Sequence, residues 1–463
     1  MFNKTNNNEN FGQLNQNKGG FSSKLGFVLA ASGSAVGLGN LWRFPYLTAQ
    51  YGGGAFILCY VLLAIFFGLV MLMLEIAIGR NTGKSVIGAF PSLNKKFKWA
   101  GYLSIIAPLI IVPYYCMIGG WVVKYACSFV IGAEGVVGEN IDSQLFFDTF
   151  KANSFESMVF FLIFAIITLV IVAYGVQKGI ENMSKILMPA LAILAVFLMI
   201  YVLCQENALQ GLSFVFVPKL EDLNFRTILG ALGQLFYSLS IGMCIMITYG
   251  SYMKKDANIK SSSAQIAVFD SAFALIASLI IIPAVFAFGG GEQGLEGNGP
   301  SLMFVQLTNV FNTIPGGPVI GALFFVLVFF AAVTSSVSLV ETIVAALCEN
   351  GKIKRITACL IVFAVIFVLG TLSTLSNGVL SWVDIAEMKI WVAFDFLANN
   401  IIIPIVAILT CLFAGWFIDK TILPKEIGLE KNKWLNKYFN VVIKYVAPIC
   451  ILIILITGLL VEL

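Results

Sequence analysis

The sequence lacks histidine altogether, and only 11% of its 463 residues are charged. Histidine is the side chain that changes charge near neutral pH, so its absence removes the usual base and proton shuttle. Soluble domains use roughly 25% charged residues. Without imidazole or a nucleophile motif outside the apolar segments, the chain is not expected to be an enzyme.

Disulfide spacing and a signal peptide are also missing. The nine cysteines lie mostly in apolar segments without paired spacing, which predicts buried thiols. The first residues are rich in Asn, Gln and Lys and lack the apolar core of a cleavable signal, so residues 1–23 are expected to form a disordered cytoplasmic tail. The net charge is only +4, and no nucleic-acid partner is expected.

What the sequence has in abundance is apolar length. Hydrophobic residues make up 59% of the chain and the mean hydropathy is +0.94. Runs of about 20 apolar residues recur along it, each long enough to cross a bilayer as a helix, so we expect an all-α membrane protein surrounded by lipid. About eleven spans are expected, at residues 25–49, 55–80, 100–130, 157–176, 183–204, 225–252, 263–288, 319–348, 356–371, 390–416 and 441–460.

The lysines and arginines alternate along these spans. They follow the even-numbered spans, for example Lys95, Lys254 and Lys352, whereas the other loops are poor in them. Because cytoplasmic loops carry the excess of basic residues, we expect a multi-pass protein of the cell (inner) membrane with a cytoplasmic amino terminus and an external carboxyl terminus.

The first span is interrupted in its middle. It contains Gly33, Gly37, Gly39, Asn40 and Arg43, residues that favour unwinding or carry polar groups at membrane depth. An unwound segment leaves amides and carbonyls without partners, which lipid does not tolerate, so the break must line a cavity. The amino end of the following half-helix suits a carboxylate, and the freed carbonyls suit cations. Close packing of helices on the glycines is the alternative.

A second interruption is expected in the sixth span, where Ser238, Ser240 and Gly242 lie halfway along an apolar helix. Interrupted segments at matching positions of two halves indicate a transporter built from an inverted repeat. We therefore divide the chain into a tail at 1–23, a first five-helix repeat at 24–205, a second, inverted repeat at 225–418, and a cytoplasmic loop with the last span at 419–463.

Residues 33–45, GSAVGLGNLWRFP, and 52–56, GGGAF, resemble the signature of the neurotransmitter:sodium symporter family, which has the LeuT fold. The resemblance covers spans 1 to 10 and implies a 5+5 inverted repeat with discontinuous spans 1 and 6. It further implies a sodium-coupled symporter that imports hydrophobic or aromatic L-amino acids by alternating access, of the bacterial eleven-span type. A sodium-coupled carrier of another small amine or osmolyte in the same fold remains the alternative, and the oligomeric state stays open.

The resemblance also implies binding sites for two sodium ions. The first would use Ala35, Asn40, Ser238 and Asp270 together with the substrate carboxylate; whether Asp270 ligates sodium directly or lies one turn away is left open. The second would use Gly33, Val36, Ala331, Thr334 and Ser335. Hydroxyls in membrane helices commonly bond back to their own helix, which is the alternative for Ser238, Thr334 and Ser335.

The expected substrate pocket and gates follow from the same resemblance. The pocket would be lined by Ala35, Leu38, Gly39, Ile111, Tyr115, Phe236, Tyr237, Ser238, Ser240, Met243, Ser335 and Leu339. Arg43 and Asp395 would form the external gate, with Phe236 and Gln234 between them and the substrate, and Lys18 and Glu349 the internal gate. The acidic Asp270 predicts that transport needs no chloride.

Overall fold

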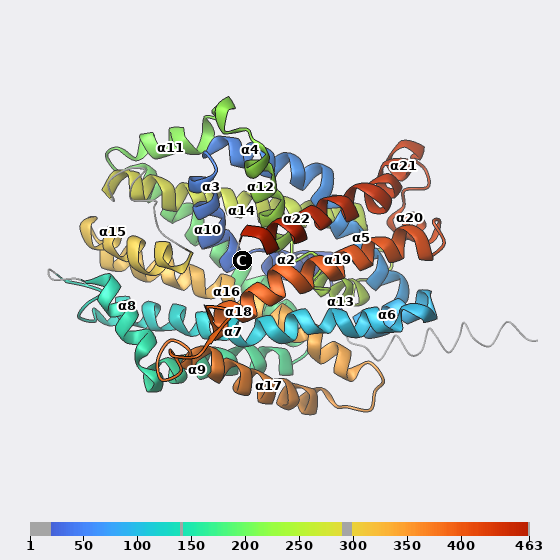
Figure 1. The fold of residues 1–463 in the computed structure, drawn as a ribbon, viewed down its shortest axis with the longest axis horizontal. Coiled ribbons are helices and arrows are strands. Elements are labelled where there is room, and N and C mark those ends of the chain that lie inside the picture. The colour runs from blue at the N-terminus through green and yellow to red at the C-terminus, as the bar shows by residue number, and fades with distance from the viewer. Residues whose placement is uncertain (1–19, 139–141, 289–298, 462–463) are drawn as a thin grey trace, which may run out of the picture.

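The structure is a computed structural model that describes residues 20–138, 142–288 and 299–461. Long helices run side by side along the longest axis of the molecule (Figure 1). The described strands are β1, Asp384–Ile385, and β2, Met388–Lys389, which pair antiparallel as one small hairpin. The protein is thus an all-α membrane protein, as the composition predicts.

The α-helices follow the apolar runs of the sequence. They are α2 Lys24–Ala35, α3 Phe44–Gln50, α4 Gly54–Leu63, α5 Leu69–Thr82, α6 Val86–Leu93, α7 Lys98–Ile131, α8 Ser143–Ala152, α9 Ser154–Ala173, α10 Asn182–Leu203, α11 Ala208–Phe216, α12 Phe225–Ser238, α13 Ile245–Ser251, α14 Ile259–Phe288, α15 Leu307–Thr313, α16 Gly317–Cys348, α17 Arg355–Leu375, α18 Ile390–Phe396, α19 Ile403–Leu412, α20 Ile422–Ile427, α21 Lys433–Val441 and α22 Ala447–Val461. Wider π-type turns join several of them into longer rods, at Gly39–Arg43, Ala64–Gly68, Val176–Glu181, Leu302–Gln306, Leu397–Ile402, Phe413–Phe417 and Val442–Val446.

Nine continuous helices in the described part of the chain are long and apolar enough to cross a membrane. A tenth span is the pair Lys24–Ala35 and Gly39–Gln50, which is bent by 53° at its break. The segment expected as the sixth span consists of two short helices, α12 and α13, and neither is long enough to cross a bilayer alone. The number of membrane spans therefore depends on whether each of the two broken segments is counted as one span.

The helices differ in how deeply they are buried. In the most apolar stretches of α7 and α16, 83% and 78% of the residues are buried, so these two helices form the centre of the bundle and pack against each other. In Val176–Leu203 and Lys433–Leu460 the share is 28%, so these outer spans expose apolar side chains such as Ile193. A surface of this kind is compatible with lipid.

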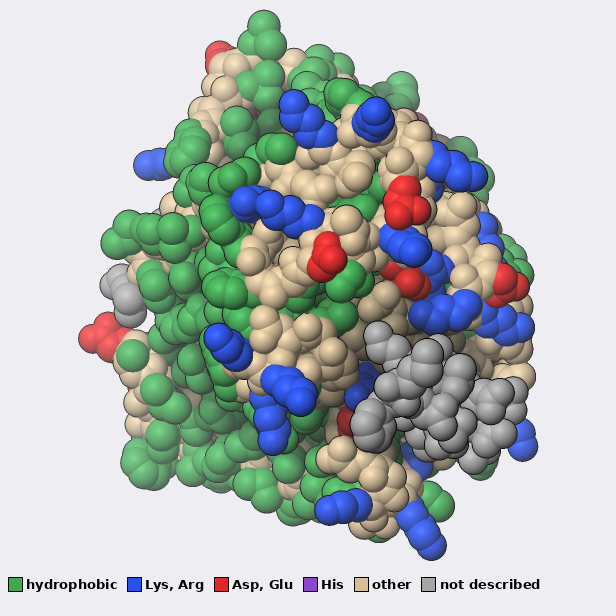
Figure 2. All heavy atoms as spheres, turned by 90° about the vertical axis from the view of Figure 1, so that its right-hand side faces the viewer, with side chains coloured by type: hydrophobic (Ala, Val, Ile, Leu, Met, Phe, Trp, Pro, Cys, Tyr) green, Lys and Arg blue, Asp and Glu red, His purple; other side chains and the backbone are tan. Residues whose placement is uncertain are grey.

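Charged side chains gather at one end of the bundle. Figure 2 views the end where α6, α20 and α21 lie, and Lys and Arg side chains outnumber the acidic ones on this face. The lysines of the loops after the even-numbered expected spans contribute to this distribution.

Candidate functional site

The first helix break is a short irregular turn. α2 ends at Ala35, and the next helical turn begins at Gly39. Asn40 stabilises the turn, because its Oδ1 accepts a hydrogen bond from the Gly37 amide at 3.1 Å. A Cβ on Gly37 would lie 2.6 Å from Ser335 Oγ, and one on Gly39 would lie 2.5 Å from a ring carbon of Tyr237. Glycine is therefore required at both positions, because the backbone packs directly against these side chains.

The second break occupies residues 239–244, between α12 and α13. Its backbone has positive φ at Ser240 (54°), Gly242 (79°) and Cys244 (59°), a conformation that ends the helix. The amide of Gly242 donates to Oε1 of Glu75 at 2.8 Å. The buried carboxylate of α5 thus satisfies a backbone group that the interruption has freed, which lipid would leave unpaired.

A small cavity lies between the two breaks, as expected for a site that the interrupted segments form together. Helices α7 and α16 complete its wall. The residues that line it are Ser34, Ala35, Gly37, Leu38, Gly39, Asn40, Ile111, Tyr115, Tyr237, Ser238, Ser240, Met243, Ile245, Ser335 and Leu339. The structure therefore brings together eleven of the twelve residues expected to contact a substrate.

Phe236 is the exception, and its expected position is corrected. Its ring packs against Phe67, with the ring centroids 5.6 Å apart, and it does not line the cavity. The aromatic ring beneath the Arg43 guanidinium belongs to Tyr237, at 5.1 Å from its centroid. Neighbouring residues of a helix point about 100° apart, so only one of this pair faces the break, and it is Tyr237.

The cavity has a polar and an apolar part. The Tyr115 hydroxyl lies near the Leu38 amide and Ser335 but makes no hydrogen bond of good geometry within the described residues. Buried polar groups normally have a partner, so such a hydroxyl suits a polar ligand group. Apolar side chains of Ile111, Met243 and Leu339 form the other part.

Three of the four residues expected at the first sodium site make direct contacts. Asp270 Oδ1 accepts hydrogen bonds from Ser238 Oγ at 2.6 Å and from Asn40 Nδ2 at 2.8 Å. The side chains of all three are buried. Tyr60 donates its hydroxyl hydrogen to Asp270 Oδ2 at 2.7 Å, a contact that sequence reasoning missed because Tyr60 lies in an uninterrupted apolar run. These residues and the Ala35 backbone form a compact, oxygen-rich cluster beside the cavity.

The residues expected at the second sodium site also converge. Ser335 Oγ lies 3.3 Å from the Gly33 carbonyl oxygen, 3.1 Å from that of Ser34 and 3.4 Å from that of Val36. Thr334 Oγ1 donates to the carbonyl oxygens of Phe330 and Ala331 at 3.0 Å, so the back-bonding alternative holds for its hydrogen. The Thr334 oxygen keeps its acceptor capacity, and the cluster offers only oxygen atoms.

Charged and polar groups lie beside Tyr237, next to the cavity. Arg43 and Asp395 both act electrostatically on the Tyr237 hydroxyl, and Asn399 donates to Asp395 Oδ1 at 2.7 Å. Gln234 Nε2 donates to the Gly39 carbonyl oxygen at 3.2 Å, which ties the two broken segments together. The residues expected at the external gate are thus close to one another.

The expected internal gate is described in part. Glu349 Oε2 accepts from the Ser85 amide at 2.8 Å, whereas Lys18 lies outside the described residues. Sequence reasoning missed a nearby ion pair between the buried Glu341 of α16 and the partly buried Arg355 of α17. The Tyr252 hydroxyl donates to Glu341 Oε1 at 2.8 Å. A lone acidic residue within an apolar span was the signal for it.

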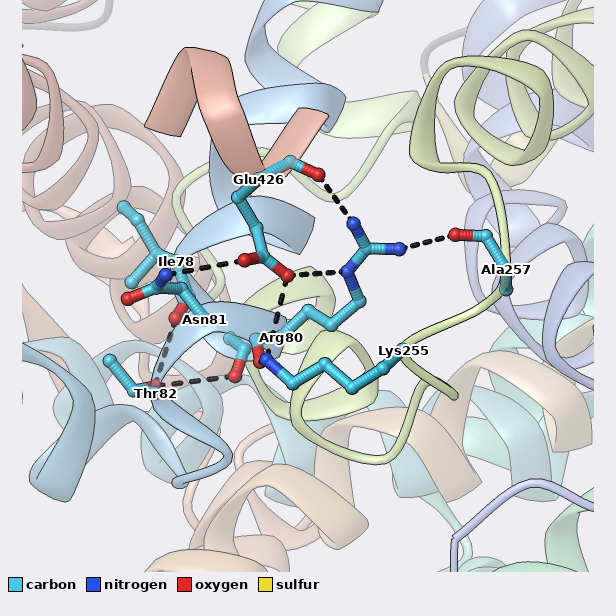
Figure 3. A network of polar contacts seen from close by, with 8 residues as sticks. Ile78, Arg80, Asn81, Thr82, Lys255, Ala257 and Glu426 are labelled. Atoms are coloured by element: carbon cyan, nitrogen blue, oxygen red, sulfur yellow. Dashed lines mark hydrogen bonds and ion pairs between the residues drawn. The ribbon is translucent and has the colours of Figure 1, made fainter. Parts of the chain in front are cut away.

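A second polar network ties α20 to the end of α5, as Figure 3 shows. Arg80 donates through Nε to Glu426 Oε1 at 2.7 Å and through its other nitrogens to the carbonyl oxygens of Ala257 and Glu426. Lys255 lies 3.5 Å from the same carboxylate oxygen of Glu426. The loop after α13 and helix α20 are therefore joined to the end of α5 through one guanidinium group.

Comparisons with known proteins agree with this geometry. Residues 18–132 and 153–462 match the family described as the sodium:neurotransmitter symporter family. The chain is 35% identical over 94% of its length to YhdH, an uncharacterised sodium-dependent transporter of Bacillus subtilis, of which 96% is covered. It is 25% identical over 86% of its length to the sodium- and chloride-dependent GABA transporter 2 of Rattus norvegicus, of which 72% is covered.

Among solved structures, that of MhsT in complex with L-phenylalanine is similar over 95% of this chain and 100% of MhsT, with 37% identity and a TM-score of 0.86. This likeness establishes the LeuT-type fold that the sequence resemblance implies. The family consists of sodium-coupled membrane carriers, so the protein is a transporter and not an enzyme. By sequence, fold and the arrangement of its two broken helices, the chain belongs to the sodium:neurotransmitter symporter family.

Proposed function

We propose that this sodium-dependent transporter imports hydrophobic or aromatic L-amino acids. The observation that carries the proposal is the cavity between the two helix breaks, which has a polar end and an apolar end. The proposed substrate carboxylate lies at the polar end, on the Leu38 and Gly39 amides and the Tyr115 hydroxyl. Amides at the start of a helix have no acceptor in their own helix, and the helix dipole favours a negative charge there.

The side chain of the substrate would lie at the apolar end, against Ile111, Met243 and Leu339. A charged side chain would be desolvated there without a partner, which costs several kcal/mol or more. Methionine adapts to different shapes, so several large side chains would fit. The L-phenylalanine in the MhsT complex supports this substrate class.

Two sodium ions are proposed as co-substrates. The first would be held by the Ala35 carbonyl with Asn40, Ser238 and Asp270, and the substrate carboxylate would complete its coordination. The second would be held by the Ser335 and Thr334 hydroxyls and by the carbonyls of Gly33, Val36 and Ala331. Both sets supply hard oxygen ligands, which suit an alkali cation.

Alternating access would follow from the inverted repeats at 24–205 and 225–418, with Arg43 and Asp395 on the outer side of the site and Glu349 on the inner side. The distribution of basic loop residues supports a cytoplasmic position for the face shown in Figure 2, in the cell membrane. Residues 1–23 would then lie in the cytoplasm.

Binding of labelled L-phenylalanine to the purified protein tests the proposed substrate class. In sodium medium we expect competition by leucine, tryptophan and methionine, and much weaker competition by glycine, aspartate and lysine. Phenethylamine, which lacks the carboxylate, should compete poorly, whereas a carrier of amines would accept it. A profile led by glycine or a charged amino acid, or equal competition by phenethylamine, would refute the proposal.

A further inference from the structure

A wide crevice lies apart from the central cavity. It lies between α6, the start of α7, the loop after α13 and the end of α16, with an empty volume of about 1,590 Å³. Four lysines line it: Lys84, Lys95, Lys98 and Lys255. They come from three separate loops, so the fold, and not one basic run of sequence, brings their charges to the same hollow.

The charge in the crevice is mostly uncompensated. Lys255 lies beside Glu426, but Lys84, Lys95 and Lys98 have no carboxylate within 4.0 Å among the residues that the structure describes. One acidic residue, Glu349, is part of the lining, and its Oε2 accepts from a backbone amide. With Lys255 beside Glu426, the other three ammonium groups against the carboxylate of Glu349 leave a positive hollow that favours a bound anion.

The crevice also has an apolar side that faces the membrane. Ile87, Leu93 and Tyr102 line it together with the lysines. Tyr102 and its neighbour Trp99 are each 52% exposed at the start of α7, where aromatic side chains mark the headgroup level of a membrane protein. One turn further on, Ile106 is exposed on the same apolar span. The mouth of the crevice therefore lies where headgroups meet acyl chains.

We propose that this crevice binds the phosphate headgroup of an anionic phospholipid, with the lysines on the phosphate and the apolar rim against the upper part of the acyl chains. Lysines in cytoplasmic loops do not by themselves indicate a binding site, because the membrane topology already accounts for them. What distinguishes this group is that it lines a hollow with a lipid-facing rim, the arrangement expected for a basic headgroup pocket. A soluble phosphate would make no use of the apolar rim.

The test compares two triple variants of the full chain that lose the same charge. The first variant combines Lys84→Gln, Lys95→Gln and Lys98→Gln, the crevice lysines without an ion pair among the described residues. Lys255 is kept because it contacts Glu426. The control, Lys178→Gln, Lys352→Gln and Lys354→Gln, removes three exposed lysines outside the crevice. Each purified protein is titrated with phosphatidylglycerol or phosphatidylcholine, and bound lipid is counted by native mass spectrometry.

The wild type and the control triple should bind one phosphatidylglycerol at least ~10-fold more tightly than phosphatidylcholine, and the crevice triple should lose this preference. Sodium-dependent phenylalanine binding and size-exclusion profiles verify that each variant is folded. An equal loss in both triples, no preference in the wild type, or displacement of the lipid by millimolar inorganic phosphate would each overturn the proposal.

Discussion

At the scale of single residues, the argument depends on oxygen atoms that the fold brings together from distant parts of the chain. Asp270 contacts residues of the first and second broken segments, and Ser335 reaches the carbonyls of the first. Carboxylates inside a membrane protein are costly unless a partner or a cation compensates them. Asp270 and Ser335 are therefore the positions at which a substitution discriminates best between sodium binding and a structural role.

The double substitution Thr334→Ala and Ser335→Ala should reduce sodium-dependent uptake by about tenfold or more. Removing two ligand hydroxyls loses interactions of about 1–3 kcal/mol each, and 1.4 kcal/mol corresponds to tenfold. Thr342→Ala is the matched control, because the Thr342 hydroxyl of the same helix bonds only to the Ser338 carbonyl within the described residues. Uptake that survives the double substitution would remove the second site from the account.

Uptake by the wild type should be the same in chloride and in gluconate medium, because Asp270 supplies a negative charge next to the first proposed sodium. Asp270→Ser should be impaired in gluconate and partly restored by chloride. The rat relative is named as chloride-dependent, so such a requirement occurs in the family. Radiolabelled uptake in the two media measures both effects, and a wild type that stops without chloride would contradict this role.

At the scale of elements, the two broken spans carry the proposed binding sites. At Gly37 and Gly39, neighbouring side chains approach the backbone so closely that a Cβ would clash with them. Gly242 has a different reason to be glycine, because its backbone adopts a positive φ. Glu75 then pairs with the amide that the second break frees. The second interruption is therefore stabilised by a specific contact with a neighbouring helix.

Gly37→Ala should reduce substrate binding by about tenfold, because the added methyl would lie 2.6 Å from Ser335 Oγ and overpacking costs about 1–3 kcal/mol. Gly233→Ala in α12 is the control: its Cβ would meet nothing within 4 Å, and alanine favours the helix. Equilibrium binding of phenylalanine measures the difference. Equal behaviour of the two variants would argue against a tightly packed break.

The network of Figure 3 predicts a pH effect on stability. Burial alone would raise the pKa of Glu426, but the hydrogen bond from Arg80 and the charge of Lys255 lower the pKa below its ordinary value of 4.5. A lowered pKa stabilises the fold above the unfolded pKa, and this contribution disappears as the pH falls through the folded value. Glu426→Gln should therefore lower the melting temperature by a few degrees at pH 7.

The same difference should shrink as the pH falls from the unfolded pKa near 4.5 through the lower folded pKa, because the wild-type carboxylate is then protonated too. Glu430→Gln, at an exposed position just after α20, is the control and should melt like the wild type over the whole pH range. Thermal unfolding of the purified proteins measures this. A difference between Glu426→Gln and wild type that stays constant from pH 7 to below the folded pKa of Glu426 would show that the charge of Glu426 does not contribute to stability.

The sequence predicts the elements better than the contacts between them. Apolar length gives most span ends to within about five residues, because lipid requires that length. The expected spans 183–204 and 441–460 are the exceptions, because the helices begin earlier, at Val176 and Lys433. The glycines and small polar residues indicate both breaks. The roles of Tyr60 and Arg80 depend on partners far away in sequence, Asp270 and Glu426, which no local pattern reveals. Phe236 and Tyr237 differ by one helical step, and only the fold decides which of them faces the cavity.

At the scale of the whole molecule, the central helices α7 and α16 hold the cavity, while the peripheral spans face lipid. Both broken segments pack on this centre, so both proposed sodium sites share the wall of one cavity. Binding of sodium and binding of substrate would then be coupled, because the proposed first site takes part of its coordination from the substrate itself.

Gradient-driven uptake tests this coupling most directly. Proteoliposomes loaded with potassium are diluted into sodium or potassium medium that contains labelled L-phenylalanine. The account predicts accumulation above the outside concentration in sodium medium alone, its collapse when a sodium ionophore is added, and none of it in the Thr334→Ala, Ser335→Ala variant. Accumulation that is equal in sodium and potassium media, or that persists with the ionophore, would contradict sodium-coupled transport of amino acids by this chain.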